Sequence, residues 1–350
     1  MDELTIPRPD DWHLHLRDGP LLQAVVGYSA AHFGRAIIMP NLRPPVTTVE
    51  QAAAYRERIL AALPPGSDFT PLMTLYLTAQ TTPQEIEQAA ASGFVQAVKL
   101  YPAGATTHSE AGVHDLRACD ETLAAMAELG LPLLVHGEEN AAELDIFERE
   151  QVFIERTLLP AMARHRRLKV VLEHVTSAEG ARLVTGNEAN LAGTFTPQHL
   201  LYNRNALLSG GLRPHLYCMP ILKREADRVA LLEAATSGHP RVFLGTDSAP
   251  HPRGAKESAC GCAGCFSAPW ALALYAEAFD SVGALGHFEA FASRNGPEFY
   301  GLPVSGQTLT LRRQVESVPE FYGAGDESGD ACIVPLRAGG EVAWSVVTRQ

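Results

Sequence analysis

Six residues with metal-binding or acid–base chemistry lie at or near the ends of predicted β-strands. Two of them are His13 and His15. Residues i and i+2 of a strand point to the same face, with Cβ atoms roughly 6–7 Å apart, so two imidazoles in that arrangement can chelate one metal ion. The other four lie on or directly after later strands and are Lys99, His136, His174 and Asp247. Together these residues predict a metal centre.

Each of these residues also has an ordinary structural explanation. The histidine pair could lie on the surface, a single histidine such as His136 or His174 could be a hydrogen-bonded core residue, and Asp247 could cap a helix. Lys99 is harder to explain in this way, because a buried ammonium group is costly unless it is paired or neutralised. Five metal-capable side chains and one lysine on the same side of the fold favour the functional interpretation. Five ligands exceed what one tetrahedral metal requires, which indicates two metal ions.

Such residues need a scaffold that gathers several strand ends. Eight β-rich runs are predicted, over residues 12–16, 35–39, 70–77, 95–101, 131–136, 169–175, 191–196 and 241–246. Helical segments separate most of them, over residues 21–32, 49–62, 83–92, 120–129, 141–164, 178–184, 223–235 and 268–279. This alternation predicts a (β/α)8 TIM barrel, in which active sites lie at the C-terminal ends of the strands. An open doubly wound sheet is the alternative.

The end of the chain differs from the rest. We assign residues 1–302 to the barrel and residues 303–350 to a C-terminal extension packed on it. Within the extension, residues 341–347 alternate in polarity as a strand does, whereas residues 321–330 read as a loop. No internal repeat or linker separates the two parts.

Composition and charge exclude several classes of function. The 350 residues are 46% hydrophobic and 19% charged, which is typical of a globular protein with a large core. The net charge of −12 argues against nucleic acid as a partner. We expect no signal peptide and no membrane span. The six cysteines are expected to be reduced, which favours a cytoplasmic location.

Two further segments invite a functional interpretation. Cys260, Cys262 and Cys265 could hold a third metal ion, but a structural zinc usually needs four ligands. We therefore favour reduced thiols in a loop of the active site. Residues 104–112 have glycines at both ends and small polar residues between them, which is typical of a lid. An ordinary mobile loop is the alternative for this segment.

Several short motifs resemble those of the amidohydrolase superfamily, and within it the short, single-function bacterial dihydroorotases. The resemblance covers residues 6–302. It is carried by Pro-Asp-Asp-Trp-His-Leu-His-Leu-Arg-Asp at 9–18, Met-Pro-Asn at 39–41, Lys-Leu-Tyr-Pro at 99–102, Val-His-Gly at 135–137, Glu-His at 173–174, Arg-Pro-His-Leu-Tyr-Cys at 213–218 and Gly-Thr-Asp-Ser-Ala-Pro-His at 245–251. It implies a barrel of the metal-dependent amidohydrolase type. No departure occurs at a position that the family uses for metal or substrate.

The resemblance implies a role for each predicted ligand. Lys99 would be carboxylated by carbon dioxide, and the resulting anionic carbamate would bridge two zinc ions. His13, His15 and Asp247 would complete the more buried metal site. His136 and His174 would complete the other. A hydroxide bridging the two ions would be the nucleophile, and Asp247 would pass its proton to the leaving amide nitrogen.

The resemblance also implies a reaction and a substrate site. The chain would be a zinc-dependent cyclic amidase that interconverts dihydroorotate and N-carbamoyl-L-aspartate in pyrimidine synthesis, and it would form a homodimer. Arg17 lies two residues beyond His15 and offers a planar fork suited to a carboxylate. The residues that would contact substrate are Arg17, Asn41, His136, Met219, His251 and Ala263, with Thr106 and Thr107 from the lid.

Two other functions compete with this one. The first is a cyclic amidase of the hydantoinase or allantoinase type. In such relatives tens of residues usually precede the histidine pair, whereas here His13 lies near the start of the chain. The second is a barrel without activity that serves as a scaffold for other enzymes. Proteins of that kind typically lose metal ligands, and all the expected ligands are present.

Overall fold

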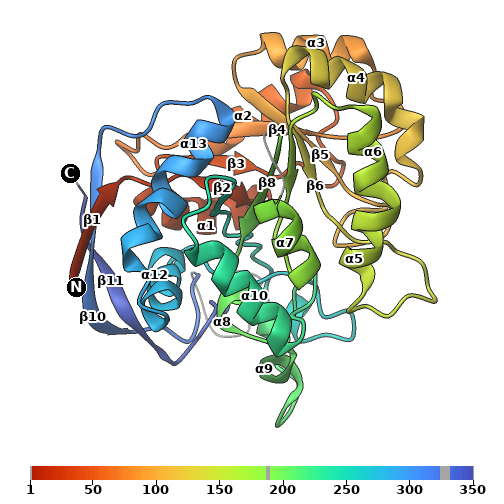
Figure 1. Cartoon of the computed structure of the whole chain (residues 1–350). Helices are drawn as coiled ribbons and strands as arrows, with labels where there is room; N and C mark the ends of the chain where they lie inside the picture. The colour runs from red at the N-terminus through yellow and green to blue at the C-terminus, as the bar shows by residue number, and fades with distance from the viewer. Residues whose placement is uncertain (1, 187–189, 324–331, 350) are drawn as a thin grey trace.

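The computed structural model describes residues 2–186, 190–323 and 332–349. Eight parallel strands form a barrel, and helices surround it (Figure 1). Each strand pairs with the next one along the chain. The strands are β2 (Asp11–Leu14), β3 (Arg35–Ile38), β4 (Thr70–Tyr76), β5 (Val95–Leu100), β6 (Leu133–Val135), β7 (Val170–Leu172), β8 (Leu191–Phe195) and β9 (Val242–Leu244). The prediction of a barrel is confirmed.

The sheet closes where β9 returns to β2. The backbone N–H of Asp247 donates to the carbonyl of His13, with N and O 2.9 Å apart. The carboxylate of Asp11 accepts from the backbone N–H of Thr246 at 2.8 Å and from its hydroxyl at 2.6 Å. The open-sheet alternative is therefore wrong. The junction of β9 with β2, here called the seam, thus contains the predicted ligands His13 and Asp247. It also contains two residues that precede them, Asp11 and Thr246.

Helices cover the outside of the barrel. They are α1 (Gly19–His32), α2 (Val49–Ala62), α3 (Pro83–Ala91), α4 (Asp120–Leu129), α5 (Arg149–Phe153), α6 (Leu159–Arg164), α7 (Ala178–Gly186), α8 (Pro197–Leu201), α9 (Arg204–Leu208), α10 (Glu225–Thr236), α11 (Arg253–Lys256), α12 (Ala271–Ser281) and α13 (Asn295–Tyr300). Short 3-10 turns lie at Leu116–Cys119, Pro214–Leu216 and Leu285–His287, and π-helical turns at Ile154–Leu158 and Ala290–Arg294. No described helix is long and apolar enough to cross a membrane.

One predicted helix begins later than expected. The helix predicted over residues 141–164 starts at Arg149, and turns occupy residues 141–148. The side chain of Asp145 accepts a hydrogen bond from the backbone N–H of Phe147 at 2.9 Å. This local bond competes with the helical hydrogen-bond pattern. The segment before Arg149 is thereby left as a loop.

A second, three-stranded antiparallel sheet joins the two ends of the chain. Its order is β1 (Glu3–Pro7), β10 (Thr308–Ser317) and β11 (Glu341–Arg349). The strand predicted over residues 341–347 is confirmed as β11, whereas β1 was not expected. The predicted boundary at residue 302 falls between α13 and β10. The loop predicted over residues 321–330 lies largely outside the described residues.

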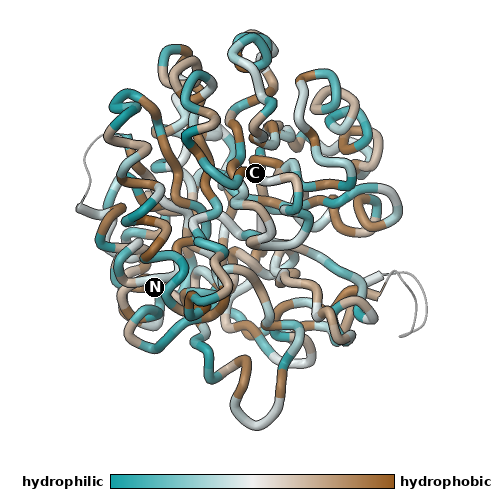
Figure 2. Tube along the Cα trace, turned by 90° about the vertical axis from the view of Figure 1, so that its right-hand side faces the viewer, coloured by the Kyte–Doolittle hydropathy of each residue, from teal (hydrophilic) through white to brown (hydrophobic). Residues whose placement is uncertain are grey.

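Apolar side chains fill the barrel and the layer between barrel and helices. Along the chain, hydrophobic stretches concentrate on the interior strands (Figure 2). Ala97 and Leu134 belong to the cluster inside the barrel, and Lys99 and His136 follow them two residues later. Because side chains two residues apart in a strand share a face, the inward face changes from apolar core to functional residues along each strand.

Gly296 tests how tightly the barrel interior is packed. A Cβ atom on Gly296 would lie 1.9 Å from Nε1 of Trp12, and the Trp12 ring stacks on Tyr300 with centroids 4.5 Å apart. We expect Gly296→Ala to destabilise the protein by about 1–3 kcal/mol, because the indole has to move. Gly286→Ala is the control, since a Cβ there meets nothing within 4 Å. Thermal melting measures both, and equal melting temperatures would contradict this packing.

Candidate active site

The first group of predicted ligands converges at the barrel seam. His13 and His15 come from the end of β2, and Asp247 follows β9. Nε2 of His13 and Nε2 of His15 are 3.3 Å apart. Oδ1 of Asp247 is 3.4 Å from the first and 3.1 Å from the second. Within the described parts of the chain, this is the only group of three His, Cys, Asp or Glu side chains close enough to hold one metal ion.

The second group of predicted ligands adjoins the first. The rings of His136 and His174 have centroids 4.8 Å apart, and the His174 ring is 5.0 Å from that of His13. Lys99 lies in β5, which pairs with β6, the strand before His136, and its Nζ is 5.1 Å from the centre of the Tyr101 ring. Five strand ends therefore bring all six residues together.

These residues face a small cavity of about 20 Å³. Eleven of the thirteen predicted site residues line it, the other two being Lys99 and His251. The full lining is His13, His15, Arg17, Asn41, Tyr101, Thr106, Thr107, His136, His174, Met219, Asp247, Ala249, Ala263 and Gly264. Three of these residues were not predicted as site residues: Tyr101, Ala249 and Gly264. Tyr101 and Ala249 lie inside motifs described above, and Gly264 follows Ala263.

Burial sets the protonation of this group in favour of metal binding. It lowers the pKa of His15 to about 3 and the pKa of His174 well below its usual value. A neutral imidazole has a free lone pair for a metal. Burial by itself would raise the pKa of Asp247, but the nearby His13, His15 and Lys99 lower it to about 2. His15 and His174 thus present neutral nitrogens, and Asp247 presents an ionised carboxylate.

Two buried glutamates orient the histidines, and the sequence analysis assigned neither a role. Glu173 contacts Nδ1 of His13 and also accepts a hydrogen bond from the Thr194 hydroxyl at 2.9 Å. Glu138 contacts Nε2 of His136 at 2.8 Å. A carboxylate on one ring nitrogen fixes the imidazole and leaves the other nitrogen for a metal. The available signal was position, because Glu173 precedes His174 and Glu138 follows His136 by two residues.

Lys99 has an environment that does not suit an ammonium ion. Its side chain is completely buried, and Nζ has no hydrogen-bond partner within the described residues. Burial lowers the pKa of Lys99 to about 8, although Glu173 and Asp247 oppose the shift. Conversion of the amine into an anionic carbamate would remove the buried cation and supply two oxygen ligands. The chemistry of the ligand set therefore fits a carboxylated lysine between two metal ions.

A second part of the site is built to receive an anion. Arg17 is 7% exposed and donates to the carbonyl of Pro250 at 3.2 Å. Its Nη2 lies 2.9 Å from Nε2 of His251. Burial, and then the charge of Arg17, lowers the pKa of His251 to about 2, so this imidazole is neutral. No carboxylate within the described residues forms an ion pair with Arg17, which leaves a buried cation available to a ligand.

The segment predicted to be a lid borders the cavity through Thr106 and Thr107. Asn41 donates to the carbonyl of Thr107 at 3.0 Å, and the Thr107 hydroxyl donates to the carbonyl of Ala263 at 3.4 Å. Nδ1 of His108 lies 3.1 Å from the carbonyl of Asn41. Arg43 forms an exposed ion pair with Glu110 of the lid. These contacts connect the segment to the loop after β3 and to the loop that contains Ala263.

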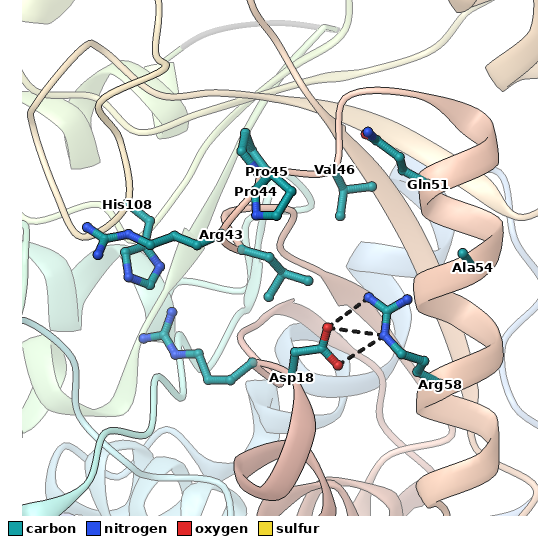
Figure 3. A pocket seen from close by; sticks show the side chains of 11 residues that line it. Asp18, Arg43, Pro44, Pro45, Val46, Gln51, Ala54, Arg58 and His108 are labelled. Carbon is teal, nitrogen blue, oxygen red and sulfur yellow. Dashed lines mark hydrogen bonds and ion pairs between the residues drawn. The ribbon is translucent and has the colours of Figure 1, made fainter.

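A side pocket of about 330 Å³ lies beside His108 of the same segment. Figure 3 shows Arg43 and His108 on one side of it and the ion pair of Asp18 with Arg58 on another. Arg17 lines both this pocket and the catalytic cavity. The two spaces are therefore neighbours across Arg17.

The three clustered cysteines differ in exposure. Cys260 is exposed, Cys262 is partly buried and Cys265 is buried, and all three are free thiols. They belong to no group of metal-ligating side chains in the described residues. The segment nevertheless borders the active site, because Ala263 and Gly264 line the cavity. This agrees with thiols in an active-site loop.

Comparison with known proteins now decides the family. Residues 10–307 match the amidohydrolase family. A dihydroorotase of Halorhodospira halophila (strain DSM 244 / SL1) is 72% identical over 344 residues, which cover 98% of this chain and 99% of the relative. The chain belongs to the dihydroorotase family of amidohydrolases. It is therefore an enzyme, and the resemblance seen in its motifs is confirmed.

Solved dihydroorotases share its fold over almost the whole length. The structure of a dihydroorotase from Campylobacter jejuni has a TM-score of 0.89 and 37% identity, and covers 99% of this chain and 98% of that one. A dihydroorotase from Saccharomyces cerevisiae, solved in complex with 5-fluoroorotic acid, has a TM-score of 0.92 and 31% identity, with 99% of each chain covered. The barrel and the small sheet are thus family features.

Lys99→Met provides a test of the unpartnered lysine that does not depend on activity. Methionine fills a similar volume without a charge, so we expect the metal-free variant to melt several degrees above the metal-free wild type. Zinc should raise the melting temperature of the wild type, because it binds only the folded state, and should barely affect the variant. Differential scanning calorimetry of both proteins, with and without zinc, measures these shifts.

The control is Lys169→Met. Lys169 donates to the carbonyl of Phe299 at 3.1 Å, so its loss should destabilise the metal-free protein and leave the response to zinc intact. A lower melting temperature of metal-free Lys99→Met, or equal stabilisation of both proteins by zinc, would contradict the assignment of Lys99.

Proposed function

We propose that this enzyme interconverts dihydroorotate and N-carbamoyl-L-aspartate with the help of two zinc ions. The observation that carries the proposal is the pairing of a ligand cluster with a buried, unpaired arginine. Asp247 and its histidines can hold a metal, and Arg17 beside His251 can hold a carboxylate. A cyclic amide that bears one carboxylate needs both. The yeast relative was solved in complex with a ring of this kind, 5-fluoroorotic acid.

The ligands divide into two metal sites in this proposal. His13, His15 and Asp247 would hold one ion, and His136 and His174 would hold the other. Lys99, converted to a carbamate, would supply anionic oxygen ligands to this centre. When bound, the ions polarise the ring carbonyl and activate a water molecule.

Asp247 moves the proton in both directions. In ring opening, water adds to the amide carbonyl, the bond between carbon and ring nitrogen breaks, and the nitrogen takes a proton. The ionised carboxylate of Asp247 accepts the proton of the attacking water and delivers it to the leaving nitrogen. In ring closure the carboxyl group of Asp247 starts protonated, and the same steps occur in reverse order. Hydrolysis creates a second carboxylate, so it is favoured as the pH rises.

The remaining site residues bind and enclose the substrate. Arg17, with Asn41 and His251, binds the carboxylate. Backbone groups of Met219 and Ala263 hold the ring amides, and His136 also faces the ring. Thr106 and Thr107 of the lid close over the bound ring and exclude water, which strengthens the polar contacts inside.

The direct test is an assay for loss of the dihydroorotate ring absorbance. We expect activity in the wild type, its loss after treatment with a chelator, and its return with zinc. Asp247→Asn should lower the turnover number by at least about 10²-fold in both directions, because the proton carrier is lost. Hydrolysis should rise and cyclisation fall with increasing pH. Parallel pH profiles in the two directions, or an active Asp247→Asn variant, would refute the mechanism.

Arg17→Met separates substrate binding from metal binding. We expect the KM for dihydroorotate to rise by the equivalent of about 2–5 kcal/mol, because the substrate carboxylate loses its buried partner. Zinc content, measured by atomic absorption, should not change. Arg43→Met is the control, since its exposed ion pair with Glu110 contributes at most about 1 kcal/mol. Loss of zinc from Arg17→Met would show that Arg17 supports the metal site instead.

A further inference from the structure

A buried lysine outside the metal centre lies between two segments that border the catalytic cavity. Lys256 ends helix α11 and is 3% exposed. Its Nζ donates to the carbonyl of Tyr217 at 2.7 Å, to that of Cys262 at 2.8 Å and to that of Gly264 at 2.7 Å. The two segments are residues 217–219 and residues 262–264, here called the ring-binding segments.

The chemistry of this contact is that of a cation that gathers carbonyl groups. An ammonium group has three donors, and Lys256 uses all of them on backbone oxygens. No carboxylate within the described residues forms an ion pair with it. Three carbonyl dipoles that point to one place repel one another unless a positive charge lies between them. Lys256 therefore stabilises the convergence of these three carbonyl groups.

This arrangement fixes the direction of the backbone that faces the cavity. The peptide unit is planar and trans, so the C=O of Cys262 and the N–H of Ala263 point in opposite directions. With the Cys262 carbonyl held by Lys256, the Ala263 N–H must point away from the lysine. The N–H groups of Ala263 and Met219 donate to no group of the described chain. Both residues line the catalytic cavity.

Other bonds hold the ends of these segments without Lys256. The Gly264 N–H donates to the Tyr217 carbonyl at 2.9 Å, and the Ala249 N–H donates to the Cys265 carbonyl at 2.7 Å. The loop therefore stays attached to the barrel when the lysine is removed. What it loses is the orientation of the peptide between Cys262 and Ala263.

We propose that Lys256 is a positioning residue for substrate recognition, which aims the backbone donor of Ala263 at a polar group of the ring. The inference rests on the proposed function and deepens it. Arg17 recognises the carboxylate, and Lys256 acts through the backbone on recognition of the cyclic amide. The sequence contains no motif that identifies Lys256, because its three partners are carbonyl groups from two separate loops.

The test compares Lys256→Met and Lys256→Gln with the wild type, all loaded with zinc. Binding of 5-fluoroorotic acid is measured by isothermal titration calorimetry, and KM and kcat are measured with dihydroorotate. We expect both variants to bind the probe about tenfold more weakly or worse, as expected from the loss of one or two hydrogen bonds. KM should rise more than kcat falls, and zinc content should match the wild type. Glu257→Gln is the control, because Glu257 pairs at the surface with His215 and Arg253.

The outcomes separate this inference from the function on which it rests. A wild type that does not convert dihydroorotate would refute the proposed function. An active wild type with variants of unchanged KM and probe affinity would refute the role of Lys256 alone. Failure of both variants to fold or to hold zinc, with a normal Glu257→Gln protein, would also overturn it, because Lys256 would then serve the fold as a whole.

Discussion

Lys99 carries a positive charge to a place where the protein provides no partner for it. An ammonium group that is fully buried and without a hydrogen bond within the described residues is destabilising. The neighbouring side chains do not supply a direct partner, since they are histidines and a carboxylate arranged around a common space. In the proposed function, neutralisation of the lysine and binding of metal ions would remove this cost. This links the stability of the barrel to its loading.

Several residues of the site have a strained backbone conformation. Five non-glycine residues of the described chain have a left-handed φ, and four of them belong to the site or its lid: Arg17, His108, His174 and Asp247. Such backbone conformations persist only where the neighbouring structure enforces them. The backbone N–H of His174 donates to the Thr194 hydroxyl at 2.7 Å, and that of Asp247 donates to the His13 carbonyl at 2.9 Å. The Arg17 carbonyl accepts from the Tyr55 hydroxyl at 2.6 Å. The rigid barrel thus supports a strained set of functional residues.

Loops complete the site on the side opposite the metal ligands. Thr107 of the predicted lid forms hydrogen bonds with Asn41 and Ala263. These are residues proposed to bind the carboxylate and the ring. The ring-binding segments are tied together by Lys256. The cavity has a volume of about 20 Å³, and Thr106 and Thr107 of the predicted lid line it. The strands thus position the predicted metal ligands, and the loops border the cavity on which these ligands lie.

The sequence by itself determined the barrel and the inner residues of the site. Strands followed by helices show clear hydrophobic periodicity in the sequence. The alternation of side chains along a strand also indicates which face of the strand carries a histidine such as His136. The start of the helix at Arg149 was missed because a local side-chain bond at Asp145 outcompetes the periodicity.

Only the tertiary structure decided which residues support the ligands and which segments meet. Strand β1 near the start of the chain pairs with β10 near its end. No local sequence pattern encodes a pairing between such distant segments. Glu173 and Glu138 were visible as neighbours of histidines, but their roles depend on the rotation of each imidazole. Lys256 was invisible as a functional residue, because its contacts are backbone carbonyls that any sequence possesses. Local spacing specifies which side chains reach the barrel rim, whereas the contacts between distant segments specify what each one does there.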